Sequence, residues 1–85
     1  MQSRKTNSAP IVQTLSEYMP KPIVDASTEG VVYRGYAPIN TGRNFPGWRI
    51  ERETTADGIT ITEYPQGSME FAFSWDDRKT YEYSR

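Results

Sequence analysis

Residues 48–63 have the sequence WRIERETTADGITITE, in which two alternating runs flank an Asp-Gly pair. In the first run Trp48 and Ile50 share one face of an extended chain, and Arg49, Glu51 and Glu53 share the other. In the second run isoleucine alternates with threonine over residues 59–62. An Asp-Gly pair tolerates the positive φ angles of a tight hairpin turn. The stretch therefore predicts two antiparallel strands joined by a turn at residues 56–58.

The same alternation continues on both sides of this hairpin. Residues 31–37, 69–75 and 80–84 each alternate between apolar or aromatic and polar side chains. The connections between these runs are short, and short connections favour antiparallel pairing in sequence order. We therefore expect an all-β domain, a meander of four or five strands that forms either a curled sheet or a small open barrel. Its expected core and corner residues are Trp48, Ile50, Phe71, Phe73, Trp75, Asp76, Arg78 and Tyr81.

The corner in this list is the string Trp75-Asp76-Asp77-Arg78. We expect Trp75 to close the core and the two aspartates to satisfy turn amides. Arg78 is then expected to offset the charge of the two aspartates. This interpretation gives the string a structural role instead of direct ligand recognition.

The N-terminal part of the chain differs in composition. Residues 1–30 hold three of the six prolines and no tryptophan or phenylalanine, so they cannot build a core alone. We therefore divide the chain into an N-terminal arm, residues 1–30, and a β domain, residues 31–85. Within the arm the apolar spacing predicts a short helix over residues 9–19. The helical stripe consists of Ile11, Val12, Leu15, Tyr18 and Met19.

A helix of about three turns is not stable alone in water, so this stripe must lie against another surface. That surface is either the chain's own sheet or a neighbouring protein, and the sequence leaves both open. In the second case the five stripe residues are the partner-docking residues of the arm.

Composition argues against catalysis and metal binding. The 85 residues include no cysteine and no histidine, so the usual nucleophile–base pairs and thiolate metal sites are absent. The carboxylates fall in turns or on strand faces, without the spacing of a calcium loop. We expect no catalytic residues, no metal, no cofactor and no small-molecule substrate.

Charge and hydropathy bear on the partners. The net charge of −1 argues against nucleic acid and anionic lipid as electrostatic partners. No apolar run reaches the length of about 18 residues that spans a membrane, and no secretory signal is expected. A small chain without disulfides or metals gains stability from other subunits, so the expected partners are proteins.

Four short motifs follow one another in the second part of the chain: YRGYA at 33–37, WRI at 48–50, WDDR at 75–78 and YEY at 81–83. In this order and spacing they resemble a small β domain of structural proteins of tailed bacteriophages. The resemblance covers residues 31–85 and implies a non-enzymatic subunit of the head decoration, neck or tail. It further implies many symmetric copies in a virion assembled in the host cytoplasm, docked on other virion proteins through the arm and a β edge.

Two other functions stay open from the sequence. The first is a small phage protein that binds and modulates a host protein, since size and acidity fit it equally well. The second is a single-stranded nucleic-acid module, in which aromatic side chains such as Tyr36 and Trp48 stack on bases beside Arg49. Most of these aromatic residues belong to the apolar face that the core needs, which weighs against the second function.

Overall fold

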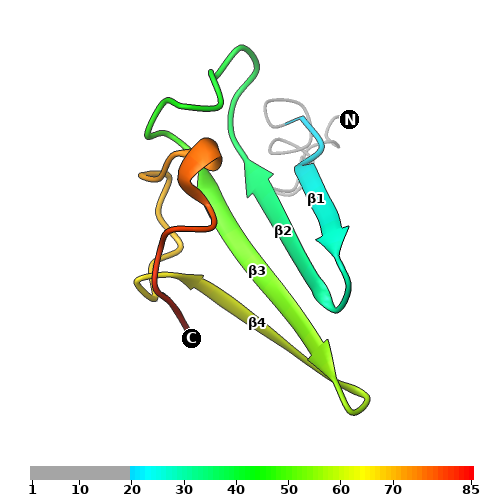
Figure 1. Ribbon diagram of the computed structural model, residues 1–85. Coiled ribbons are helices and arrows are strands. Elements are labelled where there is room, and N and C mark those ends of the chain that lie inside the picture. The colour runs from blue at the N-terminus through cyan, green and yellow to red at the C-terminus, as the bar shows by residue number, and fades with distance from the viewer. Residues whose placement is uncertain (1–19) are drawn as a thin grey trace, which may run out of the picture.

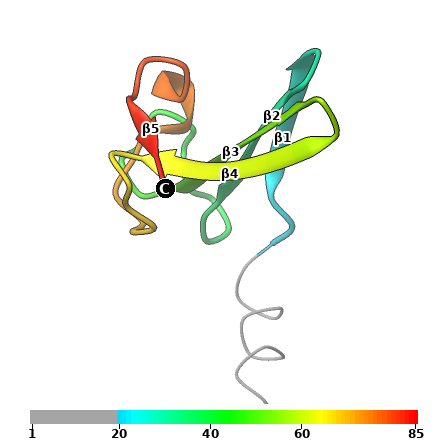
Figure 2. The same ribbon diagram turned by 90° about the horizontal axis from the view of Figure 1, so that it is seen from below.

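The structure, a computed structural model, describes residues 20–85. Its elements in chain order are β1 (Ile23–Thr28), β2 (Val31–Tyr36), β3 (Arg49–Ala56), β4 (Ile59–Pro65), the 3-10 helix η2 (Trp75–Asp77) and β5 (Tyr83–Ser84). The five strands form one sheet in the order β1-β2-β3-β4-β5, with antiparallel neighbours throughout. Figure 1 shows β1 to β4 side by side, and β5 is labelled in Figure 2. The predicted all-β meander is confirmed.

The sheet is open and curled. β1 and β5 stand at the two ends of the strand order, and Figure 2 shows η2 and β5 lying over one face of the curve. We call this the covered face; Ile23, Gly35 and Ile50 lie side by side on it because they are register partners across β1, β2 and β3. No helix among residues 20–85 has the length and apolar character needed to cross a bilayer.

The hairpin turns follow the residues that the sequence offers. Asp57 and Gly58 have φ angles of 55° and 77°, as a tight turn between β3 and β4 requires. After β4, Gln66 and Gly67 again have positive φ, and the Gly67 amide donates to the carbonyl of Tyr64 at 3.0 Å. The turn predicted at residues 56–58 is present.

The sheet begins earlier than the predicted boundary at residue 30. β1 belongs to the stretch assigned to the arm, and Ile23 to Asp25 pair with Tyr33 to Gly35 of β2. Glu29 and Gly30 form the connecting turn, with Gly30 at φ 78°. β-branched residues directly after Pro22 favour extended backbone, but the small polar residues that follow made this stretch resemble a linker.

The predicted strand over residues 69–75 is wrong. Of this run only Phe73 forms a bridge, with Trp48, and the chain then turns into η2. Residues 66–72 instead form a turn and bends, and Phe71 is 46% exposed. Serine and glycine at 67–68 let the chain leave the sheet directly after β4, which alternation alone did not reveal.

The core lies between the covered face and the segment that contains η2. Its buried hydrophobic residues are Ala37, Trp48, Ile50, Phe73 and Trp75, and the half-buried Ile23, Tyr33, Tyr81 and Tyr83 pack against them. The Trp48 and Trp75 rings lie 6.1 Å apart, and the Phe73 and Tyr81 rings meet edge to face at 5.2 Å. Of the expected core residues, Phe71 and Asp76 are exposed.

Candidate docking site

The five predicted docking residues of the arm lie outside the described residues. They are Ile11, Val12, Leu15, Tyr18 and Met19. The candidate site is therefore built from residues 20–85 alone.

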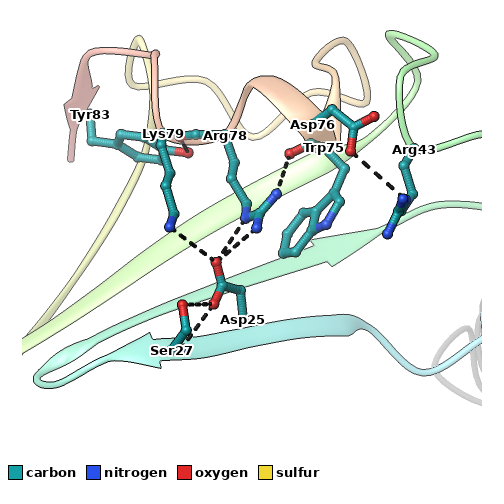
Figure 3. A network of polar contacts seen from close by, with 8 residues as sticks. All are labelled: Asp25, Ser27, Arg43, Trp75, Asp76, Arg78, Lys79 and Tyr83. Atoms are coloured by element: carbon teal, nitrogen blue, oxygen red, sulfur yellow. Dashed lines mark hydrogen bonds and ion pairs between the residues drawn. The ribbon is translucent and has the colours of Figure 1, made fainter.

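The segment after η2 is tied to the edge strand β1 by a network of polar contacts (Figure 3). Arg78 donates from Nε and Nη2 to one carboxylate oxygen of Asp25, at 3.1 and 2.9 Å. The guanidinium also lies 4.4 Å from the Trp75 ring and donates to the Trp75 carbonyl. Lys79 approaches the same carboxylate at 3.9 Å. The corner thus fastens two segments that are distant in the sequence.

Ser27 of the same strand orients the Asp25 carboxylate through hydrogen bonds. The amide and the hydroxyl of Ser27 both donate to its other carboxylate oxygen, at 3.0 and 2.6 Å. These two hydrogen bonds, followed by the hydrogen bond from Arg78, hold the pKa of Asp25 well below its usual range. The side chain is only 12% exposed, so its charge is well shielded from solvent.

The charge arrangement at the corner differs from the predicted one. Arg78 was expected to offset Asp76 and Asp77, but it pairs with Asp25. Asp76 points toward Arg43, at 3.8 Å, from an exposed position (Figure 3). The sequence could not reveal this pairing because Asp25 and Arg78 lie 53 residues apart. The corner therefore fastens the C-terminal segment to β1 through a different acidic partner from the predicted one.

Tyr83 of β5 covers the part of the covered face that is formed by Tyr33 and Arg52. The Tyr83 ring meets Tyr33 edge to face at 5.9 Å and lies 4.6 Å from the guanidinium of Arg52. Arg52 in turn forms a 2.7 Å ion pair with Glu63, which raises the pKa of Arg52. Burial raises the pKa of the Tyr83 hydroxyl, which donates to the carbonyl of Arg78 at 2.7 Å. This region is filled by side chains that contact one another.

Residues 20–85 contain no group of three histidine, cysteine, aspartate or glutamate side chains able to hold a metal ion. Arg34, like Arg52, faces a carboxylate within the sheet, with Glu53 at 3.3 Å. The guanidinium of Arg49, which the sequence placed beside stacking aromatic residues, lies 5.7 Å from the centre of the Tyr36 ring, and Trp48 is buried in the core.

Most of the outer edge of β4 has no neighbouring strand within residues 20–85. β5 pairs only with Tyr64 and Pro65 at one end of β4, so residues 59–63 have no further strand beside them within the described chain. An open hollow of about 470 Å³ runs along this part of the edge. It is lined by Ile59, Thr60, Ile61, Thr62 and Arg85.

This edge lacks the features that usually prevent strand addition. Proteins protect edge strands with charged residues, proline or bulges. Residues 59–62 include no charged residue and no proline. Ile59 and Ile61 are 62% and 40% exposed. The opposite edge, β1, is protected by an irregular register between Asp25 and Thr28. The β4 edge can therefore accept a strand of another chain through backbone hydrogen bonds and apolar contacts.

The sequence predicted this site only in part. The alternation predicted the strand and placed Ile59 and Ile61 on its apolar face, but it did not reveal that they stay exposed. In the structure β5 has two residues and β4 has seven, so β5 leaves most of the β4 edge uncovered. The alternation over residues 80–84 predicted a longer last strand and so did not indicate this.

Comparison of the chain with protein-family models, with curated proteins and with solved structures finds no match.

Proposed function

We propose that this protein is a non-enzymatic assembly subunit that docks on other proteins through the open edge of β4, assisted by its N-terminal arm. The observation that carries the proposal is the uncharged, apolar edge over residues 59–62, with Ile59 and Ile61 exposed. A strand added there satisfies backbone groups and buries both isoleucines, which is the usual mode of β-augmentation.

The resemblance of residues 31–85 to tailed-phage structural proteins supports placing this subunit in a phage particle. In a symmetric shell or tail each copy meets the same neighbours, so a short interface is repeated many times and gains avidity.

Incorporation into particles tests the proposal. We expect the protein in purified particles by mass spectrometry, and we expect Ile61→Lys to reduce its incorporation at least tenfold because a charge then lies on the docking edge. Val24→Lys is the matched control, since Val24 is 52% exposed on the protected edge strand β1. Circular dichroism should show both variants folded.

Two results would contradict the proposal. The first is absence of the protein from particles together with retention of a single stoichiometric host protein, which would favour the host-directed function. The second is normal incorporation of a folded Ile61→Lys variant.

A further inference from the structure

The backbone register of β4 determines which of its peptide groups face outward. In a two-residue hairpin the residues that flank the turn exchange hydrogen bonds, here Ala56 and Ile59, and such pairs alternate along the ladder. Ile59 and Ile61 therefore direct their peptide groups toward β3, and Thr60 and Thr62 direct theirs outward. The β5 pairing uses the same outward series, because the Gln66 amide donates to the Glu82 carbonyl at 2.6 Å.

This alternation restricts how a second antiparallel strand can be added. An antiparallel pair matches outward residues with outward residues and the intervening residues with each other. If the added strand is another β4, a two-fold axis through Thr60 satisfies the rule. Thr60 then faces Thr60 of the second copy, and Ile59 faces Ile61 of the second copy at both ends of the pair.

The side chains of β4 suit this register. The exposed isoleucines meet each other on one face, and the threonines meet on the other, and both kinds of cross-strand pair are favourable. Continuing the register brings the turn residue Asp57 of each copy beside Glu63, at the end of the hollow where Arg85 lies. Two carboxylates opposite each other repel, and the Arg85 guanidinium at this end of the hollow has a charge opposite to both of them.

The neighbouring symmetric register is less favourable. A two-fold axis through Ile61 would place Ile59 opposite Glu63, which sets an apolar side chain against a carboxylate. It would also push the hairpin turn of one copy toward Tyr64, where Ser84 of β5 is already paired. The axis through Thr60 pairs the isoleucines with each other and brings the turn only as far as Glu63, one residue short of the Tyr64–Ser84 pair.

We propose that the β4 edge is occupied by the β4 edge of a second copy of this chain, antiparallel about a two-fold axis at Thr60. This inference rests on the proposed function only in using the same edge, and it names the occupant. The result is one continuous ten-stranded sheet across two copies, with the covered faces on the same side. An isologous contact of this kind closes on itself, so it produces dimers and leaves the other surfaces free for different neighbours.

Disulfide trapping tests the register directly, since the natural chain has no cysteine. Residues that exchange hydrogen bonds across an antiparallel pair have Cα atoms about 5.5 Å apart, within the range of a disulfide. We expect full-length Thr60→Cys to form a covalent dimer under mild oxidation, at least tenfold faster than Thr55→Cys. Thr55 is the matched control because it is exposed on the same face, one strand inward, with its hydroxyl 2.8 Å from that of Thr60.

Thr62→Cys distinguishes the two symmetric registers. With the axis at Thr60 the two Thr62 residues lie far apart, so this variant should cross-link no faster than Thr55→Cys. A mixture of Thr60→Cys and Thr62→Cys that cross-links faster than Thr60→Cys alone would overturn the register. Equal rates for folded Thr60→Cys and Thr55→Cys, together with no faster cross-linking in the mixture, would overturn the dimer itself.

These outcomes separate the inference from the proposed function. If neither Thr60→Cys nor its mixture with Thr62→Cys cross-links but Ile61→Lys still loses incorporation, the edge binds a different protein and only the inference fails. If Thr60→Cys cross-links but the protein is absent from particles, the dimer stands and the assembly function fails.

Discussion

Asp25 is the residue on which the clasp between the sheet and its C-terminal segment depends. It accepts hydrogen bonds from Ser27 of its own strand and from Arg78 beyond η2, and these two sets engage different carboxylate oxygens. Both donors of Arg78 converge on one oxygen while the guanidinium stays against Trp75. Loss of the carboxylate charge would therefore weaken the attachment of a core tryptophan as well as one ion pair.

The pH dependence of stability should reveal this role. Because the folded pKa of Asp25 lies well below its unfolded value near 4, the ionised clasp stabilises the fold fully above about pH 4 and ceases to do so as the pH falls through the folded pKa. We expect Asp25→Asn to lower the free energy of unfolding by about 2 kcal/mol at pH 7. Urea titrations at several pH values should show this difference shrinking below pH 4. A difference that stays constant down to pH 2 would show that the charge of Asp25 is not involved.

At the scale of the elements, the contact between β2 and η2 depends on a glycine. A β-carbon added to Gly35 would lie 2.5 Å from an atom of the Trp75 ring and 3.1 Å from a methyl group of Ile23. Both neighbours belong to the core or pack against it, so neither can move freely. The covered face is therefore closed by direct contact of an indole ring with the backbone of β2.

We expect Gly35→Ala to destabilise the fold by about 1 to 3 kcal/mol, because the added methyl group overpacks the core. Gly42→Ala is the control: Gly42 is exposed, and the nearest atom to its added β-carbon is a side-chain oxygen of Asn44 at 3.3 Å. Chemical denaturation of both variants measures the difference. Equal stability of the two variants would mean that Trp75 does not pack on Gly35 in solution.

The elements also show what alternation in a sequence can and cannot predict. It correctly predicted β2, β3 and β4 because each has one face toward the core and a short polar turn beside it. It failed at residues 69–75, where Phe73 and Trp75 are buried without a regular strand between them. It also missed β1, whose burial is slight and whose position depends on pairing with β2 and on the remote Arg78. Local patterns therefore predicted the hairpin, but the clasp and the exposed edge depend on contacts between distant segments.

At the scale of the whole molecule, the interior is small. Five hydrophobic side chains are buried within residues 20–85, and they lie at one end of the sheet beneath the C-terminal segment. The far end of β3 and β4 extends beyond this cover as an exposed hairpin (Figure 1). The part of the molecule that gains least from its own core is therefore the part that carries the open edge.

Stability that depends on protein concentration follows from this asymmetry. If two copies pair through β4, association stabilises the folded chain by mass action, and the melting temperature rises with concentration above the dissociation constant. For a domain of this size we expect a rise of about 3 to 6 °C for each tenfold increase in concentration. Differential scanning calorimetry of the wild type from micromolar to millimolar concentration measures this rise.

Ile61→Lys should melt near the dilute wild-type temperature at every concentration, since Ile61 is already 40% exposed in one copy and contributes little to its core. Val24→Lys should retain the concentration dependence, because it leaves the β4 edge unchanged. A melting temperature of the wild type that does not vary with concentration would argue that the hairpin end is stable without a second copy and that the β4 edge serves a different partner.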